Sequence, residues 1–212
     1  MDITWLGHSC FRIKGKGATI ITDPCDETSG YRLGKITADI VTVSHKHPRH
    51  SFIDSVGGNP KVITNPGEYE IAGIFIYGSR TFRDDEKGAK RGKNTTYLIE
   101  IDDMKVCHLG DLGHILTAKQ LDEVNDADVL LVPVGGVSTL DATAAMEMVN
   151  LIDPKIVIPM HYKTDASAAE LEPVDKFLKE MGVKEVSPMP KLTINKSSLP
   201  LDTQVIVLDY KQ

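Results

Sequence analysis

The sequence has few cysteines and lacks long apolar runs. Its three cysteines, Cys10, Cys25 and Cys107, form no Cys-x-x-Cys pair. This odd, dispersed set excludes a disulfide framework and does not indicate a thiolate zinc site, so we expect reduced thiols. The longest apolar runs are far too short to span a bilayer. No basic region followed by an apolar stretch is visible at the start, so we expect no secretory signal and a cytoplasmic location.

Positive charge is also scarce. The chain has 24 Lys and Arg against 30 Asp and Glu, a formal net charge of −6. Binding of nucleic acid or of anionic lipid requires a basic face, so neither is an expected partner. We expect a small-molecule substrate. An oligomeric protein is also compatible with the sequence. The hydrophobic and charged fractions, 41% and 25%, are those of a globular protein, and 212 residues suit a single domain over 1–212.

The first half of the chain has the pattern of short strands separated by turns, and the second half alternates strands with helices. Strands are predicted over 3–6, 10–13, 19–22, 40–43, 61–63, 74–77, 96–101, 105–109, 129–132 and 156–160, with closing strands between 191 and 209. Helices are predicted over 118–124, 142–152 and 173–181. Capping-box spacing occurs at Thr117 with Gln120 and at Ser167 with Glu170. The pattern predicts a layered α/β architecture with functional residues at strand ends.

Histidine is concentrated in one place. Three of the seven histidines, His45, His47 and His50, directly follow the predicted strand 40–43. Two further strands also end at a metal-type ligand, 105–109 at Asp111 and 156–160 at His161. Imidazole and carboxylate are common ligands of zinc, so convergence of the three strand ends would make a metal site. Any one of these histidines alone is better explained by a hydrogen bond to the backbone or by surface exposure. Taken together, the histidines and Asp111 favour a metal site.

Several short motifs occur in a characteristic order. They are Trp5-Leu6-Gly7-His8-Ser9, Thr22-Asp23-Pro24, the cluster from His45 to His50, Pro66-Gly67-Glu68-Tyr69-Glu70, Arg91-Gly92-Lys93-Asn94-Thr95, His108-Leu109-Gly110-Asp111 and Pro159-Met160-His161-Tyr162. Over nearly its whole length the chain thereby resembles the metallo-β-lactamase-fold hydrolases, particularly the branch with ascorbate-6-phosphate lactonase-like proteins. The resemblance implies a four-layer αββα sandwich with one or two metals at the sheet edges.

In this resemblance the first metal is held by His45 and His47, the second by His50 and His161, and Asp111 bridges them. Two positions depart from the family pattern. Arg49 stands where the His-x-His-x-Asp-His motif has Asp, and Arg83, before Asp84, stands where the family has its next histidine. A guanidinium is protonated at ordinary pH and cannot bind a cation, so each departure removes one ligand. One metal is easier to account for than two.

Three interpretations follow. In the first, His45, His47, His50, His161 and Asp111 hold one or two metals, and the arginines bind an anionic substrate. In the second, Asp84 or Glu68 replaces a missing ligand. In the third, the metal site is lost and Arg49 and Arg83 form ion pairs with Asp111 or with other nearby acids.

Two further residues have candidate supporting roles. His8 can support a metal ligand or make a structural hydrogen bond to the backbone. Asp23 resembles the family carboxylate that orients a metal-binding histidine, and it is also a plausible turn residue.

The sequence therefore predicts a metal-dependent hydrolase in which metal-bound hydroxide attacks a small ester, lactone or phosphoester, with Asp111 as the catalytic residue. The bond type follows from the resemblance alone. Zn²⁺ is the expected metal, Mn²⁺ or Fe²⁺ are alternatives, and a metal-free protein stays open. The alternative function is a non-catalytic member of the fold, with a degenerate metal site, that binds a ligand or a partner.

Overall fold

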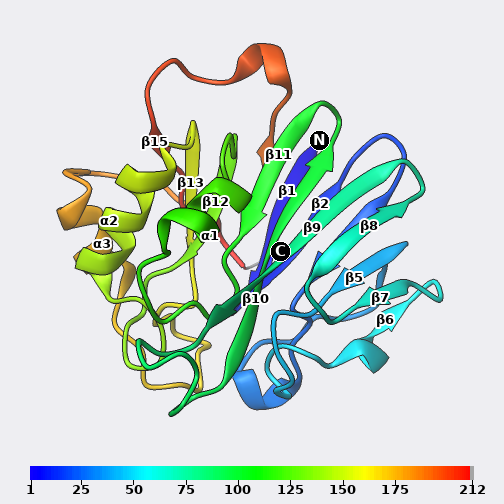
Figure 1. Ribbon diagram of the computed structural model, residues 1–212, viewed down its shortest axis with the longest axis horizontal. Coiled ribbons are helices and arrows are strands. Elements are labelled where there is room, and N and C mark those ends of the chain that lie inside the picture. Colours follow the sequence, from blue (N-terminus) through cyan, green and yellow to red (C-terminus); the bar gives the residue numbers. More distant parts are fainter. Residues whose placement is uncertain (211–212) are drawn as a thin grey trace.

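Two β-sheets packed face to face form the centre of the computed structural model, which describes residues 1–210 (Figure 1). The first sheet has the order β14-β1-β2-β3-β5-β7, and the second has the order β15-β13-β12-β11-β10-β9-β8. The first contains β1 (Asp2–Gly7), β2 (Cys10–Lys14), β3 (Thr19–Thr22), β5 (Ile40–Thr42), β7 (Lys61–Ile63) and β14 (Leu192–Thr193). The second contains β8 (Gly67–Ile71), β9 (Ile74–Phe82), β10 (Lys93–Ile101), β11 (Met104–His108), β12 (Val129–Pro133), β13 (Ile156–Met160) and β15 (Gln204–Val205). A small separate pair joins β4 (Ile36–Thr37) to β6 (Val56–Gly57).

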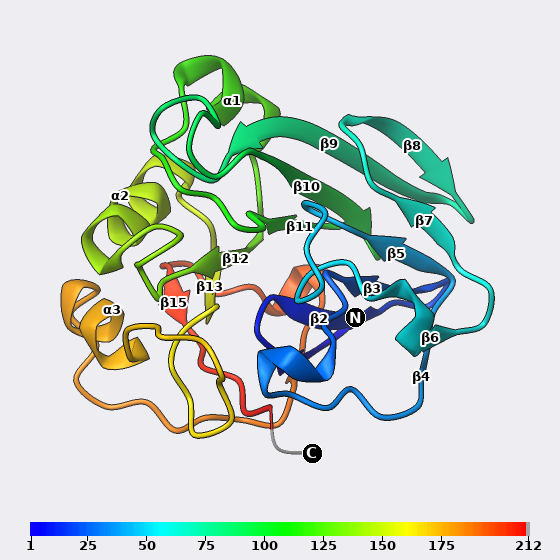
Figure 2. The same cartoon turned by 90° about the horizontal axis from the view of Figure 1, so that it is seen from below.

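The helices α1 (Ala118–Glu123), α2 (Ala142–Ile152) and α3 (Val174–Glu180) cover the face of the second sheet that points away from the first (Figure 2). The outer face of the first sheet is covered by loops, the β4–β6 pair and the short 3-10 helices η1 (Glu27–Ser29) and η2 (Ile53–Ser55). A third 3-10 helix, η3 (Lys196–Ser198), precedes β15. The predicted layered α/β architecture is confirmed. In residues 1–210 no helix has the length and apolar character needed to cross a membrane.

Neighbouring residues in the strands of the first sheet point to opposite faces. Ile20 packs into the main core between the sheets, while Ile21 packs into a second cluster on the outer face. Ile40 and Val41 divide in the same way. This follows from the two-residue period of a strand, and it shows that both faces of the sheet are buried. The three cysteines are buried and form no disulfide within residues 1–210.

Local signals in the second half fix the helix boundaries. Thr117 caps α1 through a capping box with Gln120, as predicted, and the Asp141 carboxylate accepts the Ala144 backbone N–H at the start of α2. The predicted cap at Ser167 is wrong, because no helix begins there. The backbone N–H of the next residue, Ala168, instead donates to the Ser29 carbonyl, so a tertiary contact overrides the local signal.

Strand direction brings the polar loops to one place. The strands β11, β12 and β13 are parallel, so their carboxyl ends share an edge of the second sheet. In the first sheet β3 and β5 are parallel, and β1 runs in the same direction because both β1 and β3 are antiparallel to β2. Residues just beyond these strands, including His8, Asp23, His45, Asp111 and His161, lie where the two edges meet.

Candidate metal centre

Asp111 is the centre of the group of predicted ligands. Its Oδ1 lies 3.3 Å from Nε2 of His161 and 3.6 Å from Nε2 of His50, and its Oδ2 lies 3.8 Å from Nε2 of His45. The loop after β11 is held by Asn94, whose Oδ1 accepts the Asp111 backbone N–H and whose Nδ2 donates to the carbonyl of Leu109. The convergence of strand ends inferred from the sequence is present in the structure, and the role of each residue as a ligand stays a prediction.

Asp23 orients two of these histidines. Its carboxylate accepts the backbone N–H and the hydroxyl of Ser44, at 2.7 and 2.5 Å, and lies 2.9 Å from Nδ1 of His50. Since the Ser44 hydroxyl donates to Asp23, its oxygen is left to accept from Nδ1 of His45 at 3.1 Å. Both histidines therefore carry their proton on Nδ1 and keep a lone pair on Nε2, toward Asp111. A carboxylate commonly fixes a metal-binding histidine in this way.

His47 lies at the rim of the group. Its Nδ1 accepts the Arg49 backbone N–H at 3.2 Å, and its ring centroid is 5.9 Å from that of His45 and 6.1 Å from that of His50. The compact sets of possible metal ligands within residues 1–210 are His8 with His50 and His161, and His45 with His50 and Asp111. The structure thus places His47 beside the site rather than in either set.

Arg83 follows directly after β9 and binds Asp111. Its Nε donates to Oδ2 of Asp111 at 2.9 Å, and its Nη2 lies 2.8 Å from the same oxygen. A third guanidinium nitrogen, Nη1, donates to the carbonyl of Arg91. For Arg83, the ion pair of the third interpretation is present. Arg49 differs, because its half-buried side chain makes no ion pair within residues 1–210 and lines the cleft beside His50.

The carboxylate of Asp84, one of the two proposed replacement ligands, is engaged by the backbone of its own loop. Its Oδ1 accepts the backbone N–H groups of Glu86 and Gly88, and its Oδ2 accepts those of Lys90 and Arg91. Both oxygens are therefore used to fold the 84–91 loop. Glu68 is exposed on the edge strand β8 and lines a different depression of the surface.

Burial controls the charges at the site. It lowers the pKa of His45 to about 3 and the pKa values of His50 and His161 to about 4, so these imidazoles are neutral near pH 7. Burial opposes ionisation of Asp111, but the attraction of His50, His161, His45 and Arg83 holds its pKa well below the ordinary value. Burial raises the pKa of Asp23. Neutral histidines beside a carboxylate are the protonation states that metal binding requires.

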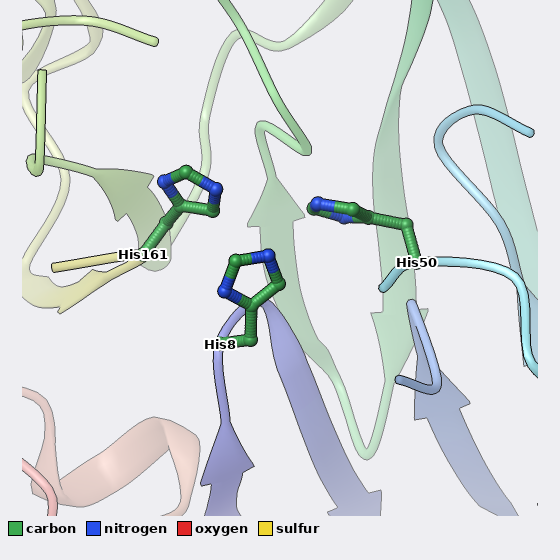
Figure 3. Close-up of side chains that lie close together, drawn as sticks. All are labelled: His8, His50 and His161. Atoms are coloured by element: carbon green, nitrogen blue, oxygen red, sulfur yellow. The ribbon is translucent and has the colours of Figure 1, made fainter. Parts of the chain in front are cut away.

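His8, for which the sequence predicted only a supporting role, lies within this group of side chains. Its side chain is buried, and its ring centroid lies 4.3 Å from that of His161 and 4.8 Å from that of His50. Figure 3 shows the three rings, delivered by three separate segments, gathered around a common point. Sequence reasoning assigned no role to Ser44 or Asn94. The only signal for Ser44 is its place before His45, and Asn94 gives none beyond its motif.

Four buried polar atoms at this place have no hydrogen-bond partner in residues 1–210. They are Nδ1 of His8, Nε2 of His45, Oδ1 of Asp111 and Nδ1 of His161. A buried polar atom without a partner costs about 1–3 kcal/mol, so a concentration of such atoms around a carboxylate is typical of a cation-binding site. The residues therefore fit a divalent metal. A cleft of about 390 Å³ opens beside them, lined by Arg49, Val137, Ser138 and the 168–171 segment.

Comparison with known proteins identifies the class. A family model described as a β-lactamase superfamily domain matches residues 2–161. The crystal structure of a metallo-β-lactamase superfamily protein from Thermotoga maritima, whose name proposes a Zn-dependent hydrolase, is 41% identical with a TM-score of 0.81. The match covers 98% of this chain and 97% of that one. The chain belongs to the metallo-β-lactamase superfamily, and the predicted fold is confirmed.

Sequence relatives define the family more narrowly. A UPF0173 protein of Pyrococcus abyssi is 32% identical over 77% of this chain and 84% of the relative. A UPF0173 metal-dependent hydrolase of Carboxydothermus hydrogenoformans is 30% identical over 77% of this chain and 85% of the relative. The chain is therefore a member of the UPF0173 metal-dependent hydrolase family. This confirms the predicted enzyme class of hydrolase and the expectation of a metal cofactor.

Proposed function

We propose that this protein hydrolyses an ester, lactone or phosphoester bond in a small anionic substrate, with zinc as its metal and manganese or iron as alternatives. The observation that carries the proposal is the group of four unpartnered buried atoms around Asp111. His45, His50, His161 and Asp111 would hold the metal, and His47, at the rim of the group, is a further candidate ligand. The bond type follows the resemblance to the ascorbate-6-phosphate lactonase-like branch.

A divalent metal bound here would supply activation of water and polarisation of the scissile bond. The chain's own groups do the rest. Asp111 presents Oδ1 toward the histidines, where it can orient a nucleophilic water. Asp23 keeps His50 and, through Ser44, His45 in the tautomer with a lone pair facing Asp111. Fixed groups of this kind need no rearrangement during the reaction, which lowers its barrier.

Arg49 supports an anionic substrate. Arg83 is already neutralised by Asp111, whereas Arg49 lines the cleft with no ion pair in the described part of the chain. A guanidinium in this state favours a carboxylate or phosphate group. Glu170, which also lines the cleft, repels an anion and so restricts where such a group can bind. The cleft volume of about 390 Å³ is at the small end for ligand sites, which suits a small molecule.

We also propose that residues 1–212 act as one domain. Support comes from the main hydrophobic cluster, which unites residues of both sheets and includes Ile3 in β1 and Leu208 after β15. The metal-type ligands come from both sheets, so neither sheet alone would form the site.

The experiment is metal removal and reloading. Chelator-treated protein is reloaded with Zn²⁺, Mn²⁺ or Fe²⁺ under reducing conditions and assayed with a panel of aryl esters, phosphoesters and lactones. We expect activity that requires metal and that is lost in Asp111→Asn. Arg49→Ala should raise KM for an anionic ester without affecting its neutral analogue. Metal-loaded protein that hydrolyses none of these bond classes would contradict the proposal.

A second function, non-catalytic ligand binding, is favoured by one observation. The Arg83 guanidinium saturates Oδ2 of Asp111, the oxygen that faces His45, and so substitutes for a cation there. Metal analysis separates the two functions. Failure to retain near-stoichiometric Zn²⁺, Mn²⁺ or Fe²⁺ under reducing conditions would support the binding protein and end the hydrolase proposal.

A further inference from the structure

The loop after β1 brings a histidine into contact with two predicted metal ligands. His8, His50 and His161 each offer a nitrogen, and these three atoms lie within 4.8 Å of one another. All three side chains are buried, with 2–3% of their surface exposed. Their rings converge from the end of β1, the loop after β5 and the end of β13 (Figure 3). A packed core would place apolar side chains here, so the presence of three imidazoles requires a reason.

The position of His8 is fixed by its own backbone. Its carbonyl accepts two hydrogen bonds at 3.0 Å, one from Nε1 of Trp5 and one from the backbone N–H of His161. Both His8 and His161 have left-handed backbone conformations, with φ of 53° and 54°. A non-glycine residue in that conformation costs on the order of 1–3 kcal/mol, and it persists where the surroundings hold it. The two histidines are therefore held together by a backbone link.

The side chains of the same two residues are unsatisfied. Within residues 1–210, Nδ1 of His8 and Nδ1 of His161 are buried and have no hydrogen-bond partner. The third ring, that of His50, has Nδ1 engaged by Asp23, which leaves Nε2 for another contact. Each of the three rings can supply one nitrogen to a shared ion, and for His161 this nitrogen is Nε2, which faces Asp111; three such nitrogens in a space this small can form part of a coordination shell.

Asp111 lies close enough to two of these rings to supply a fourth ligand atom. Its Oδ1, also unpartnered, lies 3.3 Å from Nε2 of His161 and 3.6 Å from Nε2 of His50. In tetrahedral zinc with bonds of about 2.0–2.1 Å, neighbouring ligand atoms are about 3.3–3.4 Å apart. These pairs are thus already spaced as ligands of one ion. The opposite oxygen, Oδ2, is held by Arg83, whose charge disfavours a second cation near His45.

We propose that His8 is a direct metal ligand, so that His8, His50, His161 and Asp111 form a site for one divalent transition metal. This inference rests on the proposed metal dependence and assigns the ion to a particular set of four residues. It differs from the set implied by the family resemblance, in which each metal has two histidines and Asp111. Here His8 replaces the ligand lost where Arg83 stands.

The test uses His8→Asn, because asparagine tolerates the left-handed conformation of this position. Co²⁺ and Zn²⁺ affinities are measured by calorimetry and metal content, and the Co²⁺ visible spectrum reports coordination. We expect one ion per chain in the native protein and an affinity at least about 100-fold weaker in His8→Asn, since loss of an outer-shell partner alone costs 10–100-fold. His114→Asn, a histidine outside the group that bonds to Phe82 and Ile115, serves as the matched control and should bind normally.

The outcomes are distinct. Normal affinity and an unchanged Co²⁺ spectrum in folded His8→Asn, with binding lost in His50→Asn, would overturn the role of His8 and leave the metal-dependent function intact. No metal binding by the native protein would end both proposals. X-ray absorption of zinc-loaded His45→Asn keeps the test independent of folding of the His8 variant: three imidazole ligands support the site with His8, and two contradict it.

Discussion

Arg83 holds one oxygen of Asp111 with two guanidinium nitrogens, Nε at 2.9 Å and Nη2 at 2.8 Å. This places a permanent positive charge at the carboxylate oxygen that lies 3.8 Å from Nε2 of His45. The Arg83 side chain is 20% exposed and Asp111 is 1% exposed, so solvent screens the pair only in part. The arginine therefore decides whether a cation can approach from the side of His45.

Replacement of Arg83 by histidine should create room for a second metal. Two unit charges 4 Å apart repel by about 4 kcal/mol at an effective dielectric constant of 20, so removal of the guanidinium should strengthen second-metal binding by at least about tenfold. Titration with Zn²⁺ and metal analysis measure the stoichiometry. The control is Arg80→His, because Arg80 is an exposed residue near the end of the same strand, β9. An unchanged stoichiometry and affinity in Arg83→His would contradict this role.

Loss of the Asp23 carboxylate should weaken metal binding without removing a ligand. Asp23→Asn takes away the acceptor that fixes Nδ1 of His50 and, through Ser44, that of His45. We expect a decrease in Zn²⁺ affinity of about 10–100-fold. Calorimetric titration measures it, with the exposed Asp54→Asn as the control. Equal affinity in a folded Asp23→Asn protein would show that the histidines are oriented by other contacts.

Asp84 should govern the order of the loop that follows it. Its two oxygens accept four backbone N–H groups between Glu86 and Arg91, and Asp84→Asn removes one of the oxygens as an acceptor. We expect trypsin to cleave the variant several-fold faster after Lys87, Lys90 or Arg91, because the loop opens more often. Mass spectrometry of the fragments measures the rate at each bond. Asp85→Asn, the exposed neighbour, should behave as the native chain does.

The free energy of unfolding should fall below about pH 6.5, and His108 should contribute to the loss. Its Nε2–H donates to the Ser9 carbonyl and its Nδ1 accepts the Gly110 N–H, so only the neutral ring satisfies both partners. Burial lowers the pKa of His108 despite the attraction of Asp23. As pH falls through 6.5 the unfolded chain takes up a proton that the folded chain does not, which destabilises the folded state by up to about 1.4 kcal/mol per pH unit.

Urea unfolding between pH 7 and pH 5 measures this dependence. His108→Gln should unfold more readily at pH 7 but lose less stability on acidification. The other buried histidines, His8, His45, His50 and His161, contribute to the pH dependence in both proteins and largely cancel in the comparison. An identical slope in the two proteins would assign the pH dependence to those other groups.

Much of the fold was predictable because its signals are local. The apolar runs of β3 and β5, the capping box at Thr117 and the cap at Asp141 each act within a few residues. The grouping of His45, Asp111 and His161 followed from strand ends, since parallel strands deliver their carboxyl ends to one edge. A local pattern does not register competition from tertiary contacts: the Ser29 carbonyl takes the N–H of Ala168, next to the cap predicted at Ser167.

The features of the site that the sequence did not predict depend on the exact length of a strand and on contacts between residues far apart in the chain. The strand predicted to end at Tyr77 continues to Phe82, and these extra residues place Arg83 at the sheet edge beside Asp111. Asp84 looked like a ligand because its chemistry suits one, yet the turn that follows it uses both oxygens. For His8, proximity to His161 depends on a backbone hydrogen bond across 153 residues, which no local pattern encodes.

That bond, from the His161 N–H to the His8 carbonyl, joins two distant parts of the chain. Each part supplies only some of the metal-type ligands. A cut in the 84–91 loop would leave His8, His45 and His50 on one fragment and Asp111 and His161 on the other. Neither piece alone would carry a complete set of donors. Tight metal binding would then report reassembly of the two fragments, because the ion would bind ligands from both and hold them together.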